Sequence, residues 1–208
     1  MDARTRKILA TAALAFAWSG AIAFGLCILL NYESTPGGVG RVPQTWPAKS
    51  RIAHALDRPT LVMLAHPLCS CTRASVDELA RALARAQREV SVYVLFWTPN
   101  ESPAWQETEL RRRAAAIPGV TVVSDRGGTE ARLFGAETSG QTLLFNARGR
   151  LIFSGGITSS RGHAGDNAGE SALVSLINGQ YAKVSRTFVF GCSLSGRQEK
   201  ADQTLCPQ

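Results

Sequence analysis

The chain has 208 residues, of which 45% are hydrophobic, and a formal net charge of +7 at pH 7. This length fits one globular domain with short accessory segments. The positive charge is spread along the chain, and its one tight cluster, at residues 111–113, is typical of a solvated helix face. The sequence contains no dinucleotide-binding glycine fingerprint, no serine nucleophile elbow and no zinc-protease motif. We therefore expect no nucleic-acid partner and none of these three enzyme classes.

The N-terminal segment predicts a membrane anchor. Residues 1–7 carry Arg4, Arg6 and Lys7, whereas residues 8–30 contain no charged residue. A helix of about 20 apolar residues crosses the hydrocarbon core of a bilayer, and no small-residue cleavage site precedes a polar start here. We therefore expect an uncleaved, single-pass helix in a bacterial inner membrane. The basic flank places residues 1–7 in the cytoplasm and residues 31–208 in the periplasm.

The part after the anchor is expected to contain a linker, a domain and a tail. Residues 31–47 are rich in proline and glycine and are interpreted as a flexible linker. Residues 48–180 alternate between strand-like and helix-like patterns and are interpreted as one domain. Residues 181–208 form a C-terminal tail that carries Cys192 and Cys206.

Apolar periodicity and turn residues predict the elements of the domain. In chain order they are a short helix at 52–56, a strand at 60–65, a helix opening near Thr72, a strand at 90–97, a helix at 103–116, a strand at 120–123, a short helix at 130–134, a hairpin formed by 141–146 and 151–153, and a helix at 170–178. Strands that alternate with helices in this way predict an α/β fold with a central mixed sheet flanked by helices.

The candidate catalytic residues lie where the strand at 60–65 passes into a helix. Cys69 and Cys71 are separated there by Ser70 alone. A helix N-terminus carries partial positive charge and stabilises a thiolate, and Arg73 adds a full positive charge. A thiolate is both the nucleophile of disulfide exchange and a ligand for soft metals. We predict that Cys69, Cys71 and Arg73 form the site, with Cys69 the more exposed and first attacking thiol and Cys71 the resolving one.

Two further cysteines follow the domain. Cys69, Cys71, Cys192 and Cys206 allow three pairings, among which a sequence cannot choose. Proximity favours Cys69 with Cys71, and Cys192 with Cys206 as a disulfide staple of the tail. In the alternative arrangement, Cys192 reaches the region of Cys69 and acts there.

The order of the elements around the cysteine pair resembles a thioredoxin-like fold over about residues 46–179. Within that superfamily the chain resembles the RedB-type group of membrane-anchored thioredoxin-like proteins. The matching motifs are HPLCSCTRA at 66–74, SGGIT at 154–158, RGH at 161–163, GDN at 165–167 and VFGCS at 189–193. The resemblance implies the fold, and the cysteine pair itself predicts a thiol–disulfide oxidoreductase that acts on periplasmic protein thiols or disulfides and needs no cofactor.

Two features keep other functions open. Thioredoxin-like oxidoreductases usually have two residues between the cysteines, and a cis-proline faces that pair, whereas residues 139–142 here contain no proline. Two thiolates and one imidazole suit Cu(I), and His163 lies where SCO-type copper assembly proteins carry a distal histidine. A copper site of Cys69, Cys71 and His163 is therefore one alternative. A thioredoxin-fold binding module without catalysis is the other.

Overall fold

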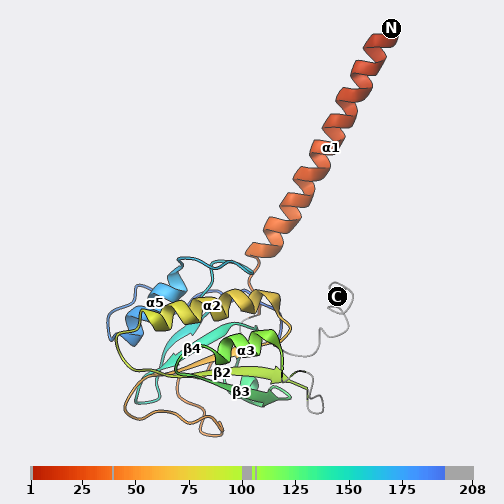
Figure 1. Cartoon of the computed structure of the whole chain (residues 1–208). Coiled ribbons are helices and arrows are strands. Elements are labelled where there is room, and N and C mark those ends of the chain that lie inside the picture. The colour runs from red at the N-terminus through yellow and green to blue at the C-terminus, as the bar shows by residue number, and fades with distance from the viewer. Residues whose placement is uncertain (1, 39, 100–104, 106, 195–208) are drawn as a thin grey trace. The chain divides into compact units, whose positions relative to one another are not determined.

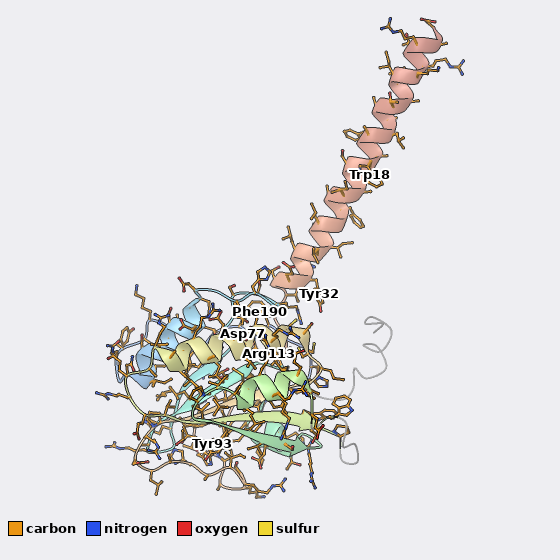
Figure 2. The ribbon with its side chains drawn as sticks, viewed as in Figure 1. Trp18, Tyr32, Asp77, Tyr93, Arg113 and Phe190 are labelled. Carbon is orange, nitrogen blue, oxygen red and sulfur yellow. The ribbon has the colours of Figure 1, made fainter. Side chains whose placement is uncertain are left out.

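The structure is a computed structural model that describes residues 2–38, 40–99, 105 and 107–194. The chain divides into two compact units, Met1–Thr35 and Pro36–Gln208. Helix α1 (Ala3–Ser34) makes up the first unit, has 32 residues and buries none of them. Its apolar side chains, such as Trp18 in Figure 2, project outward all around the helix. This helix, which contains the predicted span, is long and apolar enough to cross a membrane, a property shared by signal sequences.

The second unit is built on a five-stranded mixed sheet. Its strands are β1 (Thr60–Ala65), β2 (Ser91–Thr98), β3 (Val120–Arg126), β4 (Gln141–Phe145) and β5 (Leu151–Gly155), in the spatial order β3-β2-β1-β4-β5. Strands β1, β2 and β3 are parallel, and β4 is antiparallel to both β1 and β5. Strand β1, which leads into the cysteine pair, is therefore central. The predicted α/β fold with a mixed central sheet is confirmed.

Helices cover both faces of the sheet because the side chains of the central strand alternate between two cores. Leu61 and Met63 face the core beneath α2 (Ser70–Ala84), α3 (Glu109–Ala115) and α5 (Ala168–Ile177). These three helices lie together over one face in Figure 1. Val62 and Leu64 face the other core, which includes residues of α4 (Thr129–Leu133).

Helices α2 and α3 are also joined at the surface. Arg113 Nη1 of α3 donates to Asp77 Oδ1 of α2 over 3.0 Å, and the two side chains point toward one another in Figure 2. Both side chains are more than 40% exposed. A solvated ion pair of this kind contributes about 0–1 kcal/mol, so the buried stripe of α2, with Val76 and Leu79, dominates the packing.

Two predicted helices differ from the structure. Residues 52–56 form bends and irregular backbone rather than the predicted helix, because Ile52 is buried in the second core and the Ala55 N–H donates to Thr60 Oγ1 over 3.0 Å. Helix α3 begins only at Glu109, where the Thr108 side chain accepts from the Arg111 N–H as the N-cap. Most of the earlier part predicted as helix, 103–106, lies outside the described residues.

The segment predicted as a flexible linker is packed against the domain. Helix α1 continues to Ser34 rather than ending at residue 30. Beyond it, the Gly37 N–H donates to the Val189 carbonyl and the Leu151 N–H donates to the Gln44 carbonyl. The Trp46 ring contacts Phe134 and Phe145 edge-on, with 5.1 Å between ring centroids in each case. The backbone hydrogen bonds and the packing of Trp46 therefore order this proline- and glycine-rich segment. Amino-acid composition does not reveal either contact.

Candidate functional site

The turn between β1 and α2 places Cys69 at the helix start. Cys69 is the N-cap of α2, with an extended backbone at φ −81° and ψ 109°. Its N–H donates to the His66 carbonyl and its own carbonyl accepts from the Thr72 N–H, both over 3.1 Å. Cys71 follows in the first helical turn. The predicted juxtaposition of a helix N-terminus and a thiol is present, and the partial positive charge of α2 favours a thiolate there.

A third cysteine, Cys192 of the tail, lies directly against Cys69. The two Sγ atoms are 3.0 Å apart, and the Cys192 N–H donates to Cys69 Sγ over 3.4 Å. Cys69 is 2% exposed and Cys71 is 8% exposed, whereas Cys192 is half-buried. The prediction that Cys69 is the more exposed thiol is wrong, because the tail covers it. Of the two arrangements left open by the sequence, the structure contains the one with Cys192 at Cys69.

The contacts among the three thiols shift their pKa values in different directions. The pKa of Cys69 is lowered far below its usual range, chiefly because the Cys192 side chain and then the Cys71 side chain hydrogen-bond to its sulfur. The pKa of Cys192 is raised, first by its hydrogen bond to Cys69, then by that to Cys71 and by burial. Cys192 lowers the pKa of Cys71, but hydrogen bonding to Cys69 and burial outweigh this and raise it overall. The contacts among the three thiols therefore favour the thiolate form at Cys69 over the other two positions.

Backbone hydrogen bonds hold the tail over Cys69. The Ser139 N–H donates to the Cys192 carbonyl and the Leu194 N–H donates to the Glu137 carbonyl, both over 2.8 Å. Thr138 and Ser193 form an antiparallel bridge between these bonds. The tail therefore pairs, as a short extended strand, with the segment that leads into β4.

Arg161, from the loop after β5, supports the same stretch of tail. Its Nη1 atom donates to the Gly191 carbonyl over 2.6 Å. Its charge also lowers the pKa of Cys71, as a smaller effect than the contacts among the thiols. Arg73, predicted as the cation of the site, instead lies 3.6 Å from Glu109 at the surface. The position of Arg161 follows from the folding-back of its loop, which sequence distance does not predict.

Ser139 joins three parts of the site. Its Oγ accepts from the His66 N–H over 2.7 Å and lies 2.5 Å from Thr72 Oγ1. The end of β1, the first turn of α2 and the segment before β4 are thereby tied together beside Cys69. Sequence reasoning singled out residues 139–142 only for their lack of a proline. A buried serine that serves as both donor and acceptor leaves no distinguishing pattern in a sequence.

His66 lies beside the cysteine turn within a group of aromatic rings. Its Nδ1 accepts from the Leu68 N–H over 3.3 Å, which stabilises the turn that leads to Cys69. The imidazole stacks on Trp97 with 5.5 Å between ring centroids and meets Trp105 edge-on at 5.4 Å. These rings make one side of the site apolar.

His163 is not brought together with the cysteines as a metal site. Its side chain is exposed, and Nδ1 lies 3.1 Å from the carbonyl oxygen of Arg161. Within the described ranges, no three His, Cys, Asp or Glu side chains are grouped so that they could hold a metal ion. The copper alternative with Cys69, Cys71 and His163 therefore has no assembled ligand set in this conformation. Cys206, the other predicted partner of Cys192, lies outside the described residues.

Comparisons with known proteins bear on the fold. No family model and no curated protein matches the chain. A hypothetical protein of Sinorhizobium meliloti is similar in structure, with a TM-score of 0.52, 18% identity and coverage of 77% of this chain and 94% of that one. An uncharacterised conserved protein of Geobacillus kaustophilus is similar too, with a TM-score of 0.52, 16% identity and coverage of 77% and 92%.

A secreted disulfide oxidoreductase of Mycobacterium tuberculosis is among the more distant structures, with a TM-score of 0.39, 12% identity and coverage of 47% of this chain and 68% of that one. The strand order β3-β2-β1-β4-β5, with β1, β2 and β3 parallel and β4 antiparallel to its neighbours, is that of a thioredoxin-like fold. The central strand, the cysteines at the start of the following helix and the antiparallel pair β4–β5 stand in the order expected from the sequence. None of these three proteins carries a RedB-type name.

Proposed function

We propose that the protein is a membrane-anchored, periplasm-facing thiol–disulfide oxidoreductase with Cys69 as its nucleophile. The observation that carries this proposal is the pair of Sγ atoms of Cys69 and Cys192, 3.0 Å apart at a helix N-terminus. The thiolate is the attacking species in disulfide exchange, and the low pKa of Cys69 keeps it ionised at neutral pH. A second thiol within reach allows the mixed disulfide to be resolved. Cys71 and Cys192 are the two candidates for that role.

The proposed reaction passes two electrons between the protein and a partner. The Cys69 thiolate attacks one sulfur of a partner disulfide, forms a mixed disulfide and releases a partner thiolate. A second cysteine then attacks Cys69 Sγ and releases the other partner thiolate. We place the partners among periplasmic protein thiols and disulfides, and the basic flank before the apolar run of α1 supports that placement.

Exchange with a small disulfide tests the proposal. The reduced full-length protein in detergent, mixed with glutathione disulfide, should gain one intramolecular disulfide and release two glutathione thiols per chain. Mass spectrometry after rapid alkylation measures the loss of two hydrogen atoms from the chain, and an enzymatic thiol assay measures the released glutathione. A chain that stays fully reduced at neutral pH would leave the non-catalytic binding module as the better description.

The orientation in the membrane is a separate prediction. Arg4, Arg6 and Lys7 precede the apolar run of α1, and positive charge is retained on the cytoplasmic side. Alkaline phosphatase fused after Gln208 should therefore be active in cells, and the chain should keep its full length with α1 attached. A fusion that is active only with a cytoplasmic reporter would contradict the periplasmic orientation, and loss of α1 from the mature chain would show a signal sequence instead of an anchor.

A further inference from the structure

We infer that Cys192, and not Cys71, resolves the mixed disulfide on Cys69. Residues 189–194 hold Cys192 against Cys69 in the same way that a bound partner peptide would hold its own cysteine there. This inference rests on the proposed function and names a residue and a binding mode for it. Three observations carry it: the sulfur geometry, the pairing of the tail and the position of Cys71.

The sulfur geometry favours Cys192. Its Sγ lies 3.0 Å from that of Cys69, so a disulfide needs only a small approach of the two side chains. The contact joins residues 123 positions apart, so the intervening chain imposes no local ring strain. The Cys192 N–H also donates to Cys69 Sγ, which orients the tail backbone toward the thiolate.

The tail is held as a separate peptide strand would be held. The Ser139 N–H donates to the Cys192 carbonyl and the Leu194 N–H donates to the Glu137 carbonyl, and Thr138 bridges Ser193 between them. Adding an extended strand to free backbone groups is a general mode of peptide recognition, in which main-chain bonds supply affinity and side chains supply specificity. Residues 137–139 are thus a strand-binding edge that the chain's own tail occupies. An external partner with a cysteine in an extended segment fits the same edge once the tail leaves.

Cys71 is less well placed to resolve a mixed disulfide on Cys69. Only Ser70 separates the two cysteines, and Cys71 is fixed in the first turn of α2. Cys69 is the extended N-cap of α2, and a disulfide that closes over a single intervening residue would require this first turn to distort. Hydrogen bonding from the Cys71 side chain lowers the pKa of Cys69, so Cys71 serves to activate the nucleophile.

The steps balance in sulfur and electrons. With the tail displaced, Cys69 thiolate attacks a disulfide R–S–S–R, forms Cys69–S–S–R and releases one RS⁻. On return of the tail, the Cys192 thiol gives its proton to solvent, and its sulfur attacks Cys69 Sγ. The Cys69–Cys192 disulfide forms and the second RS⁻ leaves. Two protein thiols are oxidised and one partner disulfide is reduced to two thiols.

Peptide mapping of the oxidised full-length protein tests the pairing. Trypsin should release Cys69 and Cys71 together in residues 52–73, Cys192 in residues 187–197 and Cys206 in residues 201–208. After limited oxidation with diamide, which takes two electrons and two protons, residues 52–73 should be linked to residues 187–197. Fragmentation should place that link on Cys69. A link within residues 52–73, or between 187–197 and 201–208, as the main product would overturn the inference.

Matched serine variants then test the role in exchange. With glutathione disulfide, Cys192→Ser should accumulate the glutathione adduct of Cys69 at least about 10-fold above Cys71→Ser, because only Cys192 resolves it. Equal accumulation in both variants, or more in Cys71→Ser, would overturn the inference. If diamide forms the Cys69–Cys192 bond but glutathione disulfide never reacts, the pairing stands and the proposed function fails. If glutathione disulfide oxidises the chain through Cys71, the function stands and the inference fails.

A third variant displaces the tail and keeps every thiol. A Cβ on Gly191 would lie 2.0 Å from the Ser139 carbonyl oxygen, so Gly191→Ala must move the tail away from the strand-binding edge. Alkylation of Cys69 by iodoacetamide at about pH 10, where the thiol is ionised with or without its contact to Cys192, should then become at least about 5-fold faster, because the covering segment has shifted. The yield of the Cys69–Cys192 disulfide should fall in parallel. An unchanged alkylation rate together with an unchanged disulfide yield would show that the tail does not control access.

Discussion

Replacing Cys69 with Ser should slow the reaction with glutathione disulfide by at least about 30-fold at pH 5. The lowered pKa of Cys69 keeps it ionised at that pH, whereas an ordinary thiol with a pKa of about 8.5 is less than about 0.1% thiolate. The oxygen of serine forms no disulfide. The rate of the wild-type protein should change little between pH 5 and pH 8, and that of the variant should rise about tenfold per pH unit as its remaining thiols ionise.

The measurement is the rate of glutathione release across this pH range, with thiolate ultraviolet absorbance recorded on the same samples. Cys27→Ser is the matched control, because it makes the same atomic change within α1. The control should keep both the rate and the absorbance of the wild type. A wild-type rate that rises tenfold per pH unit, in step with the thiolate absorbance, would show that Cys69 is an ordinary thiol.

Replacing Gly135 with Ala should lower the free energy of unfolding by about 3 kcal/mol or more. Gly135 follows α4 with φ +62°, and a Cβ there would lie 2.0 Å from the Arg41 carbonyl oxygen. Alanine at this position is destabilising for two reasons. Its backbone must adopt a left-handed conformation, and its Cβ collides with the backbone of the segment predicted as a linker. Urea unfolding of the full-length protein in detergent, followed by tryptophan fluorescence, measures the change.

Gly119→Ala separates these two costs. Gly119 also has a positive φ, of +80°, but a Cβ there would meet nothing within 4 Å. This control should lose only about 1–2 kcal/mol, the cost of the left-handed conformation alone. Equal losses in the two variants would mean that residues 36–47 do not pack against the domain as the structure has them.

The strands and the position of the cysteine pair could be predicted because their causes are local. Leu61, Met63 and Leu64 belong to a short apolar run that is buried on both sides, and such a run signals a central strand by composition alone. A helix signal directly after that strand is enough to place Cys69 at a helix N-terminus. The mixed sheet and its flanking helices follow from the alternation of these patterns.

Two predictions from local patterns, the helix at 52–56 and the flexible linker at 31–47, differ from the structure because tertiary contacts outweigh the local preferences. Ile52 lies in a helix-like stretch, but it is buried in the second core and its N–H donates to Ser50 Oγ, which favours bends. Trp46 lies in a proline- and glycine-rich stretch that composition marks as a linker, yet its ring packs on Phe134 and Phe145. In both cases burial of apolar surface contributes more free energy than the local conformational preference.

The fold class, the apolar N-terminal helix and the thiol at the start of α2 could be predicted from the sequence, since each depends on residues adjacent in the chain. The groups that surround this thiol come from distant parts of the chain and are known only from the structure. Cys192 reaches Cys69 across 123 residues, the charge of Arg161 lowers the pKa of Cys71, and Ser139 contacts both His66 and Thr72. These contacts depend on how the tail and the loop after β5 fold back over the sheet. The course of these two segments depends on backbone hydrogen bonds between residues far apart in the chain. The spacing of residues in the sequence does not predict such bonds.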